Sequence, residues 1–236
     1  MLKIEQLQIS YETFGLEIEE IEFPQGVNVV LGPNGGGKSS FMKGIIGYGH
    51  ETLSKRSIQF RGEPLERVEG IISYLPQENP RFRVLVHEYL TMTSGSVSKR
   101  VFDETVMHFA LECLLGHSIE SLSGGEFKRV QCAQIALEDK PVIMLDEMEQ
   151  GLDMNYQHEM MDWICREGEG KVIVASMHDA SLALTYADTI TLVKDGRAEG
   201  PMPSASVTSE MLSACFGLPL TVRRQEGVAL VYRNLL

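Results

Sequence analysis

A glycine-rich segment directly after a short apolar run constrains the fold of this chain more than any other feature. Residues 32–39, Gly-Pro-Asn-Gly-Gly-Gly-Lys-Ser, have the spacing G-x-x-x-x-G-K-[ST] and follow residues 27–31, an apolar run typical of a strand buried on both faces. The backbone N–H groups of such a loop point inward, and a helix beginning near Lys38 adds its positive end. A merely glycine-rich turn would not require this strand–loop–helix context. The segment therefore predicts a site for the phosphates of a nucleotide.

Three later apolar runs have the same buried-strand character, at residues 142–145, 172–175 and 190–193. Segments with helical spacing separate them. One of these, residues 154–166, carries Met154, His158, Met161 and Ile164 along one expected side. Strands alternating with helices predict an α/β fold, with a mostly parallel sheet flanked by helices.

The regions around this core show other patterns. Residues 1–30 alternate apolar and polar side chains with period two, which predicts an N-terminal antiparallel β subdomain. From about 78 to 138 strand signals vanish, so we expect an inserted α-helical subdomain. An Asp-Gly pair within residues 194–197 favours a tight hairpin, and the tail from about 201 to 236 predicts a helix over 209–216 and two short strands. No long linker intervenes, so residues 1–236 are expected to form a single domain.

Composition limits the classes of partner. The chain has 21 Lys and Arg against 33 Asp and Glu, which gives a net charge of -12. Proteins that bind nucleic acids are typically basic, so this charge disfavours a nucleic acid as partner. The longest candidate for a membrane-spanning helix is the apolar segment at residues 211–222. It is shorter than the roughly 18 residues that such a helix needs, and it contains Gly217 and Pro219. The N-terminus alternates where a secretory signal would be continuously apolar. Four widely spaced cysteines without a CxxC pair favour reduced thiols and a cytosolic setting.

Two adjacent carboxylates, Asp146 and Glu147, end the apolar run at 142–145. A phosphate loop of this type needs a second magnesium anchor at the end of a neighbouring strand, and Asp146 would serve beside the Ser39 hydroxyl. Glu147 points to the other side in an extended chain, which suits contact with an attacking water. Lys38 would reach the β- and γ-phosphates. Solvated acids at a strand end are the alternative, and the phosphate loop disfavours it.

A second glycine turn, Ser123-Gly124-Gly125-Glu126, precedes a helix expected over residues 127–137. Ser-x-x-Glu is also the spacing of a capping box, and this segment alone favours an ordinary helix cap. The same turn could bind an anion, although the first site already holds the phosphates of one nucleotide.

The order of these motifs resembles that of the ATP-binding-cassette (ABC) transporter ATPases over nearly the whole chain. The matching elements are residues 32–39, Gln77, residues 122–126, residues 142–147, Leu152-Asp153 and His178. The resemblance implies a P-loop NTPase core that binds ATP and Mg²⁺. It also implies a head-to-tail dimer, in which the Ser123–Gly125 turn of one copy completes the ATP site of the other.

The resemblance also implies roles for single residues. Gln77 senses the metal and the attacking water, His178 contacts the γ-phosphate, and Asp153 touches the opposing phosphate loop. An aromatic ring upstream of the loop stacks on adenine; we favour Tyr11 over Phe14, although both could be packing residues. The full set of expected nucleotide contacts is Tyr11, Gly32, Pro33, Asn34, Gly35, Gly36, Gly37, Lys38, Ser39, Ser40, Ser123, Gly124, Gly125, Glu126 and Asp153.

Two positions depart from the family pattern. Met148-Glu149-Gln150 stands where Pro-Thr-Ser is common after the catalytic Glu, and Gln134 stands where an arginine is common. Glu149 adds a negative charge near the metal edge, which would slow turnover if it faced the phosphates.

The function implied by the resemblance is that of a nucleotide-binding subunit, which hydrolyses ATP to drive transport through separate membrane permease subunits. We expect it on the inner face of the cell membrane, touching the membrane only through the permease. The segment from 192 to 219 is similar to importers of iron-siderophores, haem and cobalamin. The alternatives are an exporter subunit or a soluble repair or assembly ATPase. Long heptad arms, a second cassette and the guanine-reading Asn-Lys-x-Asp of a GTPase are absent from the sequence.

Overall fold

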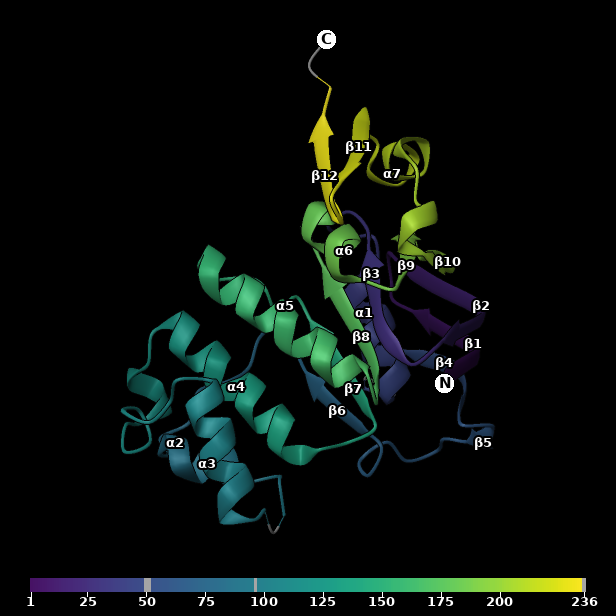
Figure 1. Cartoon of the computed structure of the whole chain (residues 1–236). Coiled ribbons are helices and arrows are strands. Elements are labelled where there is room, and N and C mark those ends of the chain that lie inside the picture. The colour runs from purple at the N-terminus through teal and green to yellow at the C-terminus, as the bar shows by residue number, and fades with distance from the viewer. Residues whose placement is uncertain (49–51, 96, 235–236) are drawn as a thin grey trace.

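A six-stranded sheet forms the centre of the computed structural model, which describes residues 1–48, 52–95 and 97–234. The strand order is β10-β9-β3-β8-β7-β6 (Figure 1). All neighbouring pairs are parallel except β9 and β10, so the expected mostly parallel sheet is confirmed. The strands are β3 (Gly26–Leu31), β6 (Ile72–Leu75), β7 (Val142–Asp146), β8 (Val172–Met177), β9 (Thr189–Lys194) and β10 (Arg197–Pro203).

An antiparallel sheet made mainly by the N-terminal strands packs beside the central sheet. Its order is β2-β1-β4-β5, with β1 (Leu2–Ser10), β2 (Gly15–Phe23), β4 (Leu53–Phe60) and β5 (Glu63–Pro64). Helix α1 (Lys38–Ile46) contacts β1 and β4 on one side and β7 and β8 on the other. The period-two apolar residues of β1 and β2 are buried against this helix in one hydrophobic core. The helix that follows the glycine-rich loop is therefore fixed between two sheets.

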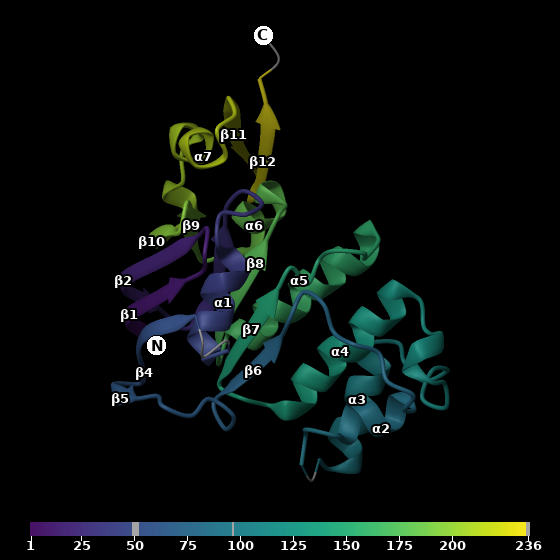
Figure 2. The same cartoon turned by 180° about the vertical axis from the view of Figure 1, so that it is seen from behind.

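Helices α5 (Met154–Gly168) and α6 (Ala180–Tyr186) pack against β3, on the face of the central sheet away from α1 (Figure 2). The expected apolar side of α5 is wrong in part, because Met154 is 74% exposed and His158 is also exposed. The buried side consists of Met160, Met161, Trp163 and Ile164. Met154, in the first turn of α5, is not part of the hydrophobic core that these residues join.

The stretch predicted to be helical contains α2 (Val86–Thr91), α3 (Lys99–His108), the short 3-10 turn η1 (Ile119–Ser121) and α4 (Gly124–Glu138). They gather on one side of the molecule, away from the antiparallel sheet (Figure 1). Helix α4 contacts α2, α3 and β6, so it connects this group to the central sheet. Phe127, Val130, Ala133, Ile135 and Leu137 are its buried apolar residues.

The tail contains the predicted helix and two strands. These are α7 (Ser209–Phe216), β11 (Leu220–Gln225) and β12 (Val228–Arg233), after a 3-10 turn η2 (Ser204–Ser206). Strand β12 packs on α6. The predicted hairpin joins β9 to β10 through Asp195 and Gly196, both with positive φ. Within the three described ranges, no helix combines the length and the apolar character needed to cross a bilayer.

Candidate active site

The glycine-rich loop lies between β3 and α1, as the sequence predicts, and two of its glycines are required by close contacts. A Cβ atom on Gly32 would lie 1.9 Å from the carbonyl oxygen of Val193 in β9. Gly37 caps α1 with φ 109°, and a Cβ there would lie 2.8 Å from the Phe14 ring. A side chain at either position would therefore displace the loop.

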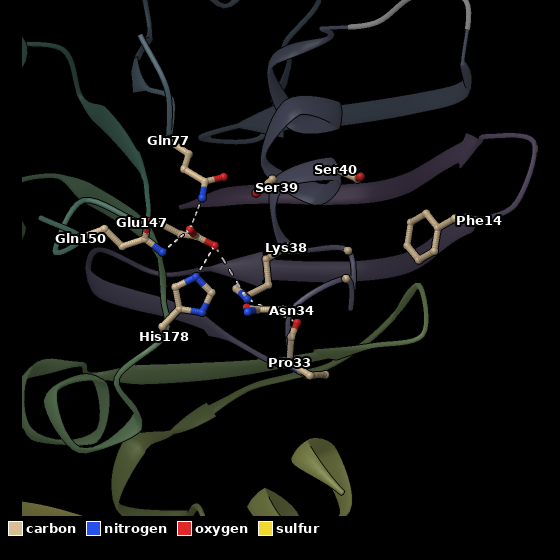
Figure 3. Close-up of a pocket in the computed structure, with 12 residues that line it drawn as sticks. Phe14, Pro33, Asn34, Lys38, Ser39, Ser40, Gln77, Glu147, Gln150 and His178 are labelled. Carbon is tan, nitrogen blue, oxygen red and sulfur yellow. Dashed lines mark hydrogen bonds and ion pairs between the residues drawn. The ribbon is translucent and has the colours of Figure 1, made fainter.

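Lys38 begins α1 and is almost fully buried, with 4% of its surface exposed. Its Nζ donates hydrogen bonds to the carbonyl oxygens of Gly32 at 2.9 Å and Pro33 at 3.4 Å, and lies 4.0 Å from Oε1 of Glu147 (Figure 3). Burial lowers the pKa of this ammonium, and the carboxylate of Glu147 opposes that effect. The lysine is thus bound to its own loop and to one acid.

Ser39 and Asp146, the predicted metal anchors, are brought together by the fold. The Ser39 hydroxyl donates to Oδ1 of Asp146 at 3.3 Å, and the hydroxyl of Ser176 in β8 donates to the same oxygen at 2.5 Å. Asp146 is fully buried at the end of β7, and its Oδ2 accepts from the Tyr74 hydroxyl at 3.5 Å. Burial, with Asp146 as the next cause, raises the pKa of Tyr74. Hydroxyl and carboxylate oxygens are ligands that suit Mg²⁺, so this donor set fits that ion.

Glu147 lies in the cavity, but not for the reason the sequence suggested. Its backbone is not extended, since φ is 52°, and a tight turn begins there. The Glu147 N–H donates to the Ser176 carbonyl at 3.1 Å and the Ser176 hydroxyl at 3.0 Å. These bonds hold the turn against β8 and direct the Glu147 side chain toward the glycine-rich loop.

Three side chains bind the Glu147 carboxylate closely (Figure 3). Nε2 of Gln77 donates to Oε2 at 2.5 Å, and Nε2 of Gln150 donates to the same oxygen at 2.7 Å. Nε2 of His178 lies 2.6 Å from Oε1. The structure therefore brings the three predicted catalytic residues, Glu147, Gln77 and His178, into one cluster. Gln150 is a fourth member that the sequence analysis did not assign.

Glu149 does not line the cavity with the phosphate loop. It is 5% exposed, and its Oε1 accepts the main-chain N–H of His178 at 2.7 Å. Its Oε2 is buried without a hydrogen-bond partner in the part of the chain that the structure describes. Burial raises the pKa of Glu149, while the bond from the His178 N–H opposes this. Glu149 therefore supports the chain at His178 and is turned away from the phosphate space.

The cavity has a volume of about 350 Å³ and is formed by the loop and by this cluster. It is lined by Phe14, Pro33, Asn34, Gly35, Gly37, Lys38, Ser39, Ser40, Gln77, Glu147, Gln150 and His178. Tyr11, the preferred adenine contact, is not among these residues, and its ring centre is 6.2 Å from that of Phe14. Tyr11 lies farther out at the end of β1 and is 43% exposed, so the geometry favours Phe14 instead.

The second glycine turn is outside this cavity. Ser123 and Glu126 form the capping box of α4: the Ser123 hydroxyl accepts from the Glu126 N–H at 3.3 Å, and Oε2 of Glu126 accepts from the Ser123 N–H at 2.7 Å. The bond from the Ser123 N–H, with the Ser123 side chain as the next cause, lowers the pKa of the Glu126 carboxyl group. Ser123 and Gly124 are exposed, and a Cβ on Gly125 would lie 3.7 Å from the Gly151 carbonyl. Asp153 caps α5 by accepting the Tyr156 N–H at 3.1 Å.

Comparison with known proteins by sequence gives matches to ABC transporters and their ATP-binding proteins. A family model described as "ABC transporter" matches residues 20–150. The hemin import ATP-binding protein HmuV of Vibrio parahaemolyticus is 31% identical, over 81% of this chain and 80% of its own. The vitamin B12 import ATP-binding protein BtuD of Escherichia coli is 32% identical, over 71% of this chain and 72% of its own.

Solved structures share the fold. The chain is similar to an ABC transporter of metal-chelate type in an inward-facing conformation, with a TM-score of 0.78, 21% identity, and coverage of 98% of this chain and 95% of the other. It is also similar to an ATP-binding cassette dimer in a post-hydrolysis state with ADP and Pi. There the TM-score is 0.74, with 20% identity and coverage of 86% and 99%.

Proposed function

The chain belongs to the ABC transporter family, and we propose that it is the ATP-hydrolysing subunit of an importer for haem, a cobalamin-like compound or a metal chelate. The observation that carries this proposal is the identity of 31% and 32% to a hemin and a vitamin B12 import ATP-binding protein. These matches cover 81% and 71% of the chain. The similarity to a transporter of metal-chelate type extends over 98% of the chain, so it includes the fold of the tail.

ATP binding is the first step at the cavity beside the glycine-rich loop. Lys38 leaves the loop carbonyls that it contacts in this structure and bonds to the β- and γ-phosphates, while Phe14 offers its ring to the base. Ser39 and Asp146, which are hydrogen-bonded to each other, would hold Mg²⁺, and the ion would supply positive charge against the phosphates.

Hydrolysis transfers the γ-phosphoryl group directly to water, without a covalent intermediate. Glu147 accepts a hydrogen bond from the attacking water and fixes its direction. Gln77 and His178 both contact Glu147 in this structure. When nucleotide is present, Gln77 turns to the metal and the attacking water, and His178 turns to the γ-phosphate. Positioning and charge neutralisation supply most of the rate in this type of reaction.

A second copy of the chain completes the site. Ser123 and Gly125 lie at the N-terminus of α4, outside the cavity of their own chain, and Ser123 is exposed. A head-to-tail pair places this helix end against the phosphates bound by the partner, where the positive end of the helix is favourable. Asp153, at the start of α5, contacts the partner's phosphate loop in the same arrangement.

The permease meets the chain next to Gln77. A second cavity of about 460 Å³ lies beside Gln77. It is lined by the segment around Gln77 and by two residues from in and after α1, namely Tyr74, Pro76, Gln77, Glu78, Asn79 and Pro80 with Lys43 and Tyr48. Gln77 lines both cavities, so a change at the γ-phosphate reaches a permease segment docked there. This contact holds the subunit at the inner face of the cell membrane.

Transport into reconstituted vesicles tests the proposal. The chain is co-purified with its membrane partner and supplied with haem, cyanocobalamin or a ferric chelate, with the Lys38→Ala complex as control. We expect ATP-dependent accumulation of one cargo, and none with Lys38→Ala. Export of cargo from the compartment would instead indicate an exporter, and failure of the chain to co-purify with any membrane protein would indicate a soluble ATPase.

A further inference from the structure

The Glu147 carboxylate receives contacts from four segments of the chain. Three of its neighbours lie on other segments of the chain: Lys38 on α1, Gln77 after β6 and His178 after β8. The fourth, Gln150, belongs to the turn that Glu147 itself begins. Gln150 therefore stays beside Glu147 whatever the other segments do.

The backbone of the turn determines where the Gln150 side chain can make contact. The Gln150 N–H donates to the Glu147 carbonyl oxygen at 3.3 Å, and Glu147 and Gly151 have positive φ values of 52° and 78°. Met148, inside the turn, is fully buried in the core. This anchoring holds the Gln150 backbone, so its amide reaches Oε2 of Glu147 at 2.7 Å from one direction.

The distribution of donors over the two carboxylate oxygens matters for catalysis. Gln77 and Gln150 both donate to Oε2, whereas Oε1 faces His178. When Gln77 turns to the metal and His178 to the γ-phosphate, Gln150 is the remaining side-chain donor to Oε2 among those the structure describes. A carboxylate held at one oxygen keeps the other oxygen available, in a fixed direction, for the attacking water.

We propose that Gln150 is a positioning residue for ATP hydrolysis: its amide holds Oε2 of Glu147 so that Oε1 binds the attacking water. The amide is neutral and cannot be deprotonated at neutral pH, so it orients the base without competing for the proton. The proposal rests on the function proposed above, and it gives the Met148-Glu149-Gln150 segment a role in the chemistry of this chain.

Steady-state hydrolysis and nucleotide binding by Gln150→Ala test this role. We expect kcat to fall about tenfold, the effect of roughly one lost positioning hydrogen bond, while the Kd for ATP stays within about twofold. Gln157→Ala is the matched control, because Gln157 Nε2 donates to the Glu149 carbonyl at 3.1 Å and does not touch Glu147. Gln150→Glu is a second variant of nearly the same shape that lacks the donor, and its kcat should fall further.

A double-mutant cycle separates positioning from general support of the turn. In a Glu147→Gln background, Gln150→Ala should change the residual rate by less than about twofold, because the carboxylate it orients is gone. An unchanged kcat in Gln150→Ala, an equal loss in Gln157→Ala, or additive losses in the cycle would overturn the proposal. Tighter ATP binding at unchanged kcat would also overturn it, since the bond would then only restrain the nucleotide-free state.

The proposed function is checked separately in the same assay. Wild-type chain that hydrolyses ATP, with the rate lost in Lys38→Ala, supports the ATPase site whatever Gln150→Ala does. Absence of hydrolysis in the wild-type chain with its partners present would contradict the proposed function itself.

Discussion

Three carboxylates lie within four positions at the end of β7, and each has a different environment. Asp146 accepts hydroxyl groups, Glu147 is bound by two amides and an imidazole, and Glu149 accepts one main-chain N–H. Only Glu149 has its second oxygen buried and unpartnered within the described residues. A buried charge without a partner is unfavourable, so Glu149 is the acid with the clearest energetic cost.

Glu149→Gln should stabilise the protein at alkaline pH. Burial raises the pKa of Glu149 above its usual 4.5, so the folded chain binds more protons than the unfolded chain between these two values. The stability associated with this group is complete below pH 4.5 and is lost as the pH rises through the raised value. The substitution removes that loss, and we expect a gain of about 1 kcal/mol near pH 8 that shrinks toward pH 4.5.

Urea unfolding over this pH range measures the effect. Glu112→Gln, at an exposed position, changes the net charge equally and serves as the control. A stability difference for Glu149→Gln that is independent of pH would show that the carboxylate is not penalised by burial.

Single residues differ in how far the sequence predicts them. Lys38, Ser39, Asp146 and Glu147 belong to motifs whose spacing already places them at one sheet edge, and the structure brings them together. Gln150 has no such spacing signal, because its contact depends on the left-handed backbone at Glu147.

Choosing between Phe14 and Tyr11 needs the path of the loop between β1 and β2, which a period-two pattern does not specify. Phe14 precedes Gly15 and packs near Gly37, whereas Tyr11 remains outside.

The hairpin between β9 and β10 supports the glycine-rich loop. The Gly196 N–H donates to the Gly36 carbonyl oxygen at 3.2 Å. The Gly196 carbonyl oxygen accepts from the Glu17 N–H at 2.9 Å. Gly196 has φ 73°, and a Cβ there would lie 1.8 Å from the Gly15 carbonyl oxygen. One turn thus connects the phosphate loop with the antiparallel sheet.

Gly196→Ala should therefore destabilise the protein by at least about 2 kcal/mol and weaken ATP binding, since backbone on both sides must move. Gly62→Ala is the matched control. Gly62 also follows a residue of positive φ and has φ 87°, and a Cβ there would have no non-neighbouring atom of the described residues within 4 Å. Its cost should be only the backbone strain of about 1 kcal/mol, with ATP binding unchanged. The two variants are compared by unfolding and by nucleotide titration. If both lost equal folding stability and equal ATP affinity, the hairpin would not support the loop.

The N-terminus of α4 has two roles that substitution can separate. Ser123→Arg should abolish hydrolysis while the isolated chain keeps its affinity for ATP, because an arginine there blocks closure of the pair. Ser98→Arg at the cap of α3 loses a similar bond, to the Val101 N–H at 3.3 Å, and should cost about 1 kcal/mol with hydrolysis retained. If ATP affinity of dilute Ser123→Arg fell as much as hydrolysis, Ser123 would be only a helix cap.

Secondary-structure elements were predictable where packing on both faces produces continuous apolar runs. Strands β3, β7, β8 and β9 fall in this class, and they are the strands that place the loop, the carboxylates and His178. Strand β6 was not predicted because it is short and contains Ser73 and Tyr74. Strand β4 was not predicted because only two of its residues, Ile58 and Phe60 at one end, are buried.

The arrangement of the whole molecule bears on the proposal that two chains together form the complete ATPase. The phosphate loop and Glu147 line one cavity, whereas Ser123 lies outside it, at the N-terminus of α4 in a separate group of elements (Figure 1). In the proposed head-to-tail pair each copy completes the site of the other, so two sites form at once. The sequence order of the motifs implies this pairing by resemblance.

The association of Glu147→Gln in the presence of ATP and Mg²⁺ tests this account most directly. The substitution removes the base and should slow hydrolysis at least about 100-fold while ATP still binds, so the closed pair accumulates. Light scattering after size separation should show a dimer with ATP and a monomer with ADP, and Ser123→Arg in the same background should stay monomeric with ATP. A Glu147→Gln chain that binds ATP but remains a monomer, or that hydrolyses it at the wild-type rate, would contradict the account.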